Sequence, residues 1–262
     1  MTPSEIQIDP WFRRYRPAPD AAARLVYFPH AGGSASACHQ LSGALAPRIE
    51  VLAVQYPGRQ DRFDEPCVET VEQFAAQIHR ALDRLDGLHD KPTAFFGHSM
   101  GSVIAYEVAR RLEAAQAVSA RPRTPSPARL VVSGRRAPDI ARDERVHLSG
   151  DEGLIAELHG LAGTDARLLA DEGVLELILP PLRADYRAIE TYVWTPGPPL
   201  GCPITAVIGD CDPEVNRDEA AAWQRHTTGE FALRVLPGDH FYLGEGALGV
   251  AELLREELTA RV

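Results

Sequence analysis

Residues 93–109 read TAFFGHSMGSVIAYEVA and decide the fold of this 262-residue chain. An apolar run predicts a strand that leads into the pattern G-x-S-x-G at 97–101, and the residues that follow predict a helix. A serine in such a strand–turn–helix occupies a strained tight turn, which a side chain at Gly97 or Gly101 would crowd. This context favours Ser99 as a catalytic nucleophile over a surface serine in a plain turn.

Short apolar runs alternate with helical runs along the rest of the chain. Strands are predicted at 24–29, 49–56, 92–97, 130–133, 204–208 and 231–236, and helices at 68–85, 102–112 and 247–261. This alternation indicates an α/β fold with a mostly parallel central sheet flanked by helices on both faces. A chain of 262 residues fits one such unit, so we expect residues 1–262 to form a single domain.

The segment 138–200 breaks the alternation, because it has a helical pattern and no clear strand. Its apolar positions are Leu154, Ile155, Leu158, Leu161, Leu168, Leu169, Val174, Leu175, Leu177 and Ile178. Pro180-Pro181 is expected to interrupt these helices. A helical insertion between two core strands predicts a lid that covers Ser99 and forms an apolar pocket. Ordinary helices packed on the sheet are the alternative.

A serine needs a base to take its proton, and chains with this elbow place the acid before the histidine. His240 follows the last predicted strand, so it has the required order and position. His98 adjoins the serine, but its side chain should point away into the walls of the elbow. His226 is near a predicted helix end and resembles a solvated or capping residue.

The acid should follow the strand that precedes the histidine. Asp210 and Asp212 both lie there, and Pro213 holds the chain extended at Asp212. We expect Asp212 to fix the imidazole tautomer of His240 and Asp210 to serve the turn. Asp239 is a third candidate, but it is too close in sequence to the histidine to orient it well.

Two backbone N–H groups should stabilise the oxyanion that forms on the substrate. One belongs to Met100, the residue after the nucleophile, and the other to the loop PHAGGS at 29–34, where we choose Ala31. Histidine and cysteine clusters with zinc spacing are absent from the sequence, so neither a metal nor a cofactor is predicted.

Composition excludes several classes of protein. The 27 basic and 37 acidic residues give a net charge of −10, which argues against binding nucleic acid. No stretch approaches the roughly 18 apolar residues of a membrane span, and the N-terminus lacks the apolar run of a secretory signal. Cys38, Cys67, Cys202 and Cys211 show no C-x-x-C spacing. Free thiols and a cytoplasmic location are therefore expected.

Eight stretches together resemble one family. They are WFRRY (11–15), FPHAGGS (28–34), QYPGRQDRF (55–63), FFGHSMGSVIAYEVA (95–109), VSGRRAP (132–138), LPPLRADY (179–186), CPITAVIGDCDP (202–213) and PGDHFYL (237–243). The sequence is similar to type II thioesterases of modular polyketide and nonribosomal peptide synthesis, which are α/β-hydrolases with a helical lid. GHSMG alone is shared by many hydrolases, whereas FPHAGG, YPGR-x-x-R and SGRRAP together are much more specific.

The resemblance implies an editing activity. Such enzymes hydrolyse stalled or aberrant acyl groups from the phosphopantetheine arm of acyl carrier or peptidyl carrier protein domains, through an acyl-serine intermediate. A general serine esterase or lipase and an acyltransferase on small molecules remain alternatives, because they would use the same residues. A non-catalytic binding protein of this fold would lack a triad member, and none is missing here.

The acidity of the chain raises a question about such partners. Carrier proteins are usually acidic, so docking would require a local basic patch on this chain. Arg13, Arg14 and Arg16, or Arg135 and Arg136, could supply one. Structural ion pairs are an equally good explanation of these arginines.

Overall fold

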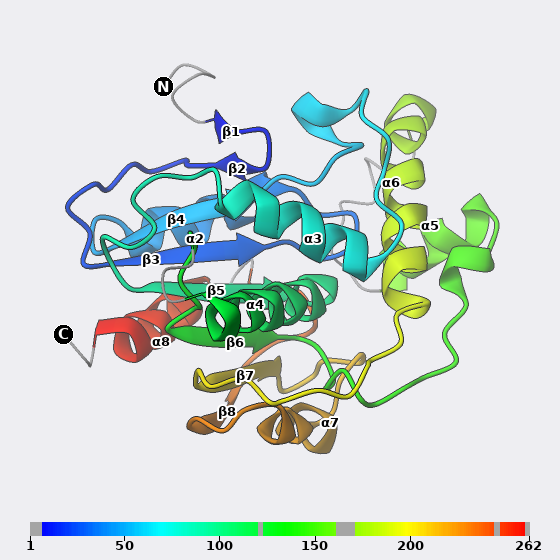
Figure 1. The fold of residues 1–262 in the computed structure, drawn as a ribbon. Helices are drawn as coiled ribbons and strands as arrows, with labels where there is room; N and C mark the ends of the chain where they lie inside the picture. Colours follow the sequence, from blue (N-terminus) through cyan, green and yellow to red (C-terminus); the bar gives the residue numbers. More distant parts are fainter. Residues whose placement is uncertain (1–6, 120–122, 161–170, 244–246, 260–262) are drawn as a thin grey trace.

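The computed structural model describes residues 7–119, 123–160, 171–243 and 247–259. Within these ranges eight strands form one sheet in the order β1-β2-β4-β3-β5-β6-β7-β8 (Figure 1). The strands are β1 (Gln7–Asp9), β2 (Phe12–Arg13), β3 (Ala23–Phe28), β4 (Ile49–Val54), β5 (Thr93–His98), β6 (Arg129–Ser133), β7 (Ile204–Gly209) and β8 (Phe231–Leu236). Neighbours from β4 to β8 pair in parallel, whereas β1 and β2 add an antiparallel edge beside β4. The predicted α/β class with a mostly parallel sheet is confirmed.

Helices cover both faces of this sheet. The described α-helices are α2 (His39–Leu45), α3 (Val71–Leu82), α4 (Met100–Val118), α5 (Asp151–Gly160), α6 (Glu172–Glu190), α7 (Arg217–Ala221) and α8 (Ala247–Thr259). The described 3₁₀ helices are η1 (Ala35–Cys38), η2 (Gln60–Arg62), η3 (Val146–Leu148) and η5 (Ala222–His226). α3 and α4 pack on one face, and α2 and α8 pack on the other (Figure 1). No helix among the described residues is both long and apolar enough to cross a bilayer.

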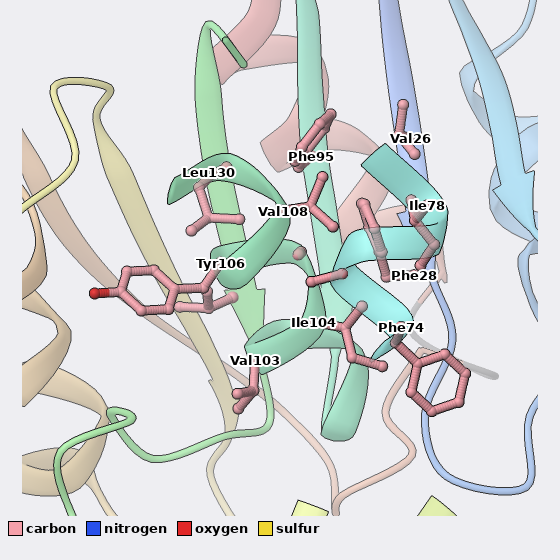
Figure 2. Packing of buried hydrophobic residues seen from close by; sticks show 14 of the residues in the cluster. Val26, Phe28, Phe74, Ile78, Phe95, Val103, Ile104, Tyr106, Val108 and Leu130 are labelled. Carbon is pink, nitrogen blue, oxygen red and sulfur yellow. The ribbon is translucent and has the colours of Figure 1, made fainter. Parts of the chain in front are cut away.

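Alternate residues of each central strand face the two helical layers. In β3, Val26 and Phe28 join the cluster under α3 and α4, whereas Leu25 and Tyr27 join the cluster under α2 and α8. Successive strand side chains point to opposite faces, so a strand buried on both sides is a continuous apolar run. Figure 2 shows the first cluster, in which side chains of α3 and α4 meet those of β3, β5 and β6.

The 138–200 segment leaves the sheet after β6 and returns before β7, and its described residues form η3, α5 and α6. Figure 1 shows α5 and α6 beyond the carboxyl ends of the parallel strands. Leu154, Leu179 and Leu182 form a small apolar cluster of their own within this insertion. The predicted apolar positions Leu161, Leu168 and Leu169 lie outside the described residues.

The prediction that Pro180-Pro181 interrupts the helical pattern is wrong. α6 continues through both prolines to Glu190. Because prolines lack an N–H, the carbonyls of Glu176 and Leu177 lose their helical partners. Both of these residues are exposed, so water can satisfy those carbonyls and the helix persists.

Two other details were beyond the sequence patterns. The helix predicted at 102–112 begins at Met100 and continues to Val118. This extension contains AAQA, which favours a helix by intrinsic propensity although it adds nothing to the apolar stripe. The edge strands β1 and β2 were not predicted, because two or three residues are too few to show a period.

Candidate active site

Ser99 occupies a strained turn between β5 and α4. Its φ and ψ are 54° and −119°, a conformation that residues with a Cβ rarely adopt. A Cβ at Gly97 would overlap the carbonyl oxygen of Gly101, and a Cβ at Gly101 would overlap that of Phe28. Both glycines are therefore required by the close approach of backbone, as the elbow pattern predicts.

Of the three candidate carboxylates, Asp212 faces His240. The Nδ1 atom of His240 is 3.0 Å from Oδ1 and 3.1 Å from Oδ2 of Asp212, and the aspartate side chain is fully buried. Asp210 is exposed and accepts a hydrogen bond from the N–H of Gly238 at 2.9 Å. Asp239 accepts one from the N–H of Phe241 at 2.8 Å. Asp210 and Asp239 thus stabilise turns, and Asp212 holds the imidazole.

The end of β6 connects the serine turn to His240. The N–H of Ser99 donates to the carbonyl of Ser133 at 2.7 Å. The next residue, Gly134, has a φ of +61°, and a Cβ there would be 3.2 Å from Cε1 of His240. Ser133 and Gly134 therefore bring elbow and imidazole together. Both residues belong to the VSGRRAP stretch, whose sequence alone does not indicate this role.

The side chain of His98 is fully buried and lies beside His240. Its Nδ1 lies 2.9 Å from the hydroxyl of Ser133, and its ring centroid is 5.1 Å from that of His240. Burial, together with the neighbouring His240 and His30, holds the pKa of His98 well below its usual range. Burial also lowers the pKa of His30 to about 4. His98 and His30 are thus neutral rings packed beside His240.

The loop after β3 contains Ala31, whose N–H is predicted to bind the oxyanion. The N–H of Gly33 donates to the carbonyl of His30 at 2.9 Å, and that of Gly32 donates to Asp185 at 2.8 Å. Among the described residues, the N–H of Ala31 has no hydrogen-bond partner. Met100 begins α4, so its N–H has no partner within the helix. These two amides are the ones predicted to bind the oxyanion.

A buried ion pair that the sequence analysis missed supports this loop. The guanidinium of Arg59 makes two bonds to Asp185, at 2.5 and 2.9 Å. Arg59 belongs to the YPGR stretch and Asp185 to the LPPLRADY stretch, which are 126 residues apart. The one sequence signal for this pair is that both residues belong to stretches that carry the family resemblance.

The structure corrects the prediction for His226 and removes two arginines from the candidate docking patch. His226 is buried rather than solvated, and it bonds to the hydroxyl of Tyr106 at 3.1 Å and to Asp139 at 2.9 Å.

The side chains of Arg13 and Arg136 are only 5% and 6% exposed, and each pairs with a carboxylate, at 2.5 and 2.6 Å respectively. These two arginines make structural ion pairs and do not form a docking patch.

A cavity of about 1120 Å³ opens between α5, α6 and the segment that carries Cys67 and Glu69. Apolar side chains of the insertion line it, including Ile155, Leu175 and Leu179. None of the lining residues is a predicted catalytic residue, so this cavity lies on the insertion and not at Ser99 itself.

The parallel sheet, the serine elbow and the buried histidine–aspartate pair define a serine hydrolase of the α/β-hydrolase fold. A family model for the thioesterase domain matches residues 23–258. The chain is 47% identical to thioesterase PikA5 of Streptomyces venezuelae over 94% of its length and 85% of that protein. It is 35% identical to gramicidin S biosynthesis protein GrsT of Aneurinibacillus migulanus, covering 96% of this chain and 95% of GrsT.

Solved structures agree with these relatives. The structure of the type II thioesterase BorB from the borrelidin biosynthetic cluster is 46% identical, with a TM-score of 0.85, and the match covers 96% of this chain and 99% of BorB. YbtT, the type II thioesterase from the yersiniabactin pathway, is 29% identical with a TM-score of 0.82, over 95% and 98% of the two chains. The chain belongs to the thioesterase family, in the group of type II thioesterases.

Proposed function

We propose that this enzyme hydrolyses stalled or aberrant acyl groups from the phosphopantetheine arms of acyl carrier or peptidyl carrier protein domains. The observation that carries the proposal is similarity over almost the whole chain to type II thioesterases of such pathways, with a serine elbow in place. GrsT belongs to gramicidin S biosynthesis and YbtT to a mixed peptide and polyketide pathway. A role in polyketide or nonribosomal peptide biosynthesis follows from these relationships.

Ser99, His240 and Asp212 are the proposed catalytic triad. The hydroxyl oxygen of Ser99 attacks the thioester carbonyl while Nε2 of His240 takes its proton. Asp212 keeps the other ring proton on Nδ1, 3.0 Å from its own Oδ1, so Nε2 is free to act as the base. The N–H groups of Ala31 and Met100 stabilise the negative oxygen of the tetrahedral intermediate.

The intermediate then releases the pantetheine sulfur. A thiol has a pKa of about 8.5, so its thiolate is a good leaving group and full proton transfer from His240 need not come first. The departing thiolate then takes the proton from His240, which restores the base. His240 next deprotonates water, which attacks the acyl-serine, and the proton returns to the oxygen of Ser99 as the free acid leaves. The nucleophile and the base come from this chain alone.

Mass spectrometry of loaded carrier domains tests the proposal. Carriers bearing acetyl, propionyl, butyryl or longer acyl groups should return to the free phosphopantetheine form, and H₂¹⁸O should place one ¹⁸O in each released acid. An acyltransferase would instead leave the acyl group on an alcohol or amine. If the enzyme cleaves p-nitrophenyl esters and leaves carriers loaded, it is a general esterase.

We also propose that the 138–200 insertion is a lid that supplies acyl-binding surface. Its cluster around Leu179 is apolar, and the insertion lies beyond the strand ends that carry the elbow. Leu179→Phe should shift the preferred acyl chain toward shorter groups, since each methylene in an apolar site contributes about 1–3 kcal/mol. The sequence places Leu177 among the apolar residues expected to form the pocket, but it is 50% exposed and does not line the cavity, so Leu177→Phe is the matched control. Identical chain-length profiles for the two variants would mean that the acyl group binds elsewhere.

A cytoplasmic location is part of the proposal. Cys38, Cys67, Cys202 and Cys211 are all free thiols, which suits a reducing compartment. Cell fractionation with a compartment-specific thiol label tests this location. Recovery with the secreted or periplasmic fraction would exclude it.

A further inference from the structure

Asp185 of α6 carries a fully buried carboxylate into the loop that follows β3. Its Oδ2 accepts hydrogen bonds from the N–H of Gly32 at 2.8 Å and from Nη1 of Arg59 at 2.5 Å. Its Oδ1 accepts a third, from Nη2 of Arg59 at 2.9 Å. Nη1 of Arg59 also donates to the carbonyl of Gly33 at 3.1 Å. One ion pair therefore holds two consecutive residues of the loop.

Burying this ion pair costs free energy, but its geometry fixes the position and orientation of the Asp185 carboxylate. Removing two charges from water carries a desolvation penalty, and a buried ion pair often stabilises a protein no more than apolar residues would. The planar guanidinium, however, fixes a carboxylate in position and orientation through two parallel bonds. The second oxygen of Asp185 then presents a fixed acceptor to Gly32. The ion pair is therefore better explained by the need to position the loop after β3 than by a contribution to the stability of the fold.

The insertion also contacts the loop directly through an apolar side chain. Gly32 has a φ of +74°, and a Cβ placed there would be 2.8 Å from Cδ1 of Leu182. Leu182 and Asp185 are one turn apart, so the same face of α6 supplies both contacts. The loop is held between this face of α6 and the Arg59 segment.

These anchors set the orientation of the Ala31 amide. The Ala31 N–H belongs to the same planar unit as the His30 carbonyl, which accepts from Gly33 at 2.9 Å. In a trans peptide the N–H points opposite to the C=O, so fixing that carbonyl directs the Ala31 N–H. Asp185 fixes the next unit through Gly32, and Arg59 fixes the carbonyl of Gly33.

We infer that Asp185 is a positioning residue for the oxyanion hole, acting through Gly32 and through Arg59. The helical insertion would thus complete the catalytic geometry as well as supply the proposed acyl-binding surface. The inference rests on the proposed function, because it takes Ala31 as a donor to the oxyanion of a thioester carbonyl. It makes the C-terminal half of α6 part of the catalytic scaffold.

The two halves of α6 differ in a way that fits this role. Ala188 and Ile189 in the C-terminal half belong to the main core, whereas Leu177 in the N-terminal half is 50% exposed. If the insertion moves during catalysis, Asp185 must stay in place for the enzyme to remain active. Displacing the C-terminal half would leave Arg59 as a buried, unpaired charge.

Asp185→Asn tests the inference, with Glu50→Gln as its matched control. Glu50 is also buried, and it pairs with Arg24 at 3.1 Å, at the starts of β4 and β3, the opposite end of the strands from the loop. Each change removes one buried carboxylate charge and keeps the side-chain shape. Only the first should disturb the oxyanion hole.

We expect Asp185→Asn to lower kcat about 10²–10³-fold, the usual effect of losing one oxyanion donor, and to change KM by less than about threefold. Phosphonylation of Ser99 by a fluorophosphonate should slow in parallel, because its phosphoryl oxygen uses the same hole. Arg59→Lys keeps the positive charge but cannot make the two parallel hydrogen bonds of a guanidinium, so it should give a smaller loss of kcat. Glu50→Gln should keep kcat near that of the wild type.

The inference is overturned if folded Asp185→Asn keeps more than about a tenth of the wild-type kcat, or if Glu50→Gln loses as much. Thermal unfolding establishes that each variant is folded before its rate is compared. If Asp185→Asn does not fold, Arg59→Lys decides, and an unchanged kcat there refutes the inference. Fluorophosphonate labelling needs no carrier substrate, so the proposed function can fail without affecting this test.

Discussion

Asp212→Asn is the sharpest test of the proposed triad, because the structure dictates how the amide would lie. Oδ1 of Asp212 accepts from the N–H of Glu214 at 2.8 Å, so the amide oxygen of asparagine should keep that position. The amide NH₂ then replaces Oδ2, which lies 3.1 Å from Nδ1 of His240. The amide oxygen would still lie 3.0 Å from Nδ1, but the NH₂ group 3.1 Å away would repel an Nδ1–H, which favours moving the ring proton to Nε2.

A proton on Nε2 prevents His240 from accepting the proton of Ser99. The corresponding change in a serine protease triad lowers kcat about 10⁴-fold, which is about 5.4 kcal/mol of transition-state stabilisation. We expect a loss of this order in kcat/KM for hydrolysis of an acyl-pantetheine thioester, with little change in KM. Urea unfolding should show that the variant is folded.

Asp210→Asn is the matched control. Asp210 is exposed and bonds to the turn at Gly238 and to the neighbouring Cys211, so its substitution should change kcat/KM by less than about threefold. A larger loss for Asp210→Asn than for Asp212→Asn, or losses below tenfold for both, would refute the assignment of the acid.

Three further predictions concern the elbow and its surroundings. Ser99→Ala should leave less than about a hundredth of the thioesterase rate while thermal unfolding is unchanged, and a higher residual rate would contradict its role as nucleophile. Gly101→Ala should destabilise the protein by about 1–3 kcal/mol or more in urea unfolding, because its Cβ would overlap the backbone carbonyl of Phe28; an unchanged midpoint would show that the elbow can relax. His98 should make the free energy of unfolding decrease as the pH falls below about 6.5, by up to about 1.4 kcal/mol per pH unit, since the unfolded chain binds a proton that the buried ring does not. His98→Gln should reduce that slope, and identical slopes from pH 8 to 5 would show that His98 does not contribute.

The histidine arrangement gives the site a particular electrostatic character. His98 and His30 both have lowered pKa values, and both rings lie near Phe241, at centroid distances of 5.8 and 4.9 Å. Neutral rings beside His240 add no positive charge that would oppose its protonation during catalysis. Apart from the Asp212 carboxylate, the rings packed near the proposed base are thus apolar or uncharged.

The sequence by itself determined the local parts of this protein. The elbow at 97–101 is predictable because a strand, two glycines and a helix are consecutive in the chain, and the backbone crowding that they relieve is local. The strands of the parallel sheet can also be predicted from the sequence, since burial on both faces makes each one a continuous apolar run. Asp212 could be preferred over Asp210 from the proline that follows it.

Only the tertiary structure decided how distant segments meet. Nothing in the spacing of Arg59 and Asp185 indicates that they touch, because their contact depends on where α6 packs against the loop after β3. The burial of His226 likewise depends on Asp139 and Tyr106, which lie 87 and 120 residues away in the chain. Periodicity reports which face of an element is apolar, but it carries no information on which polar side chains of two packed elements share an interface. Those contacts arise when the insertion folds back over the carboxyl ends of the sheet.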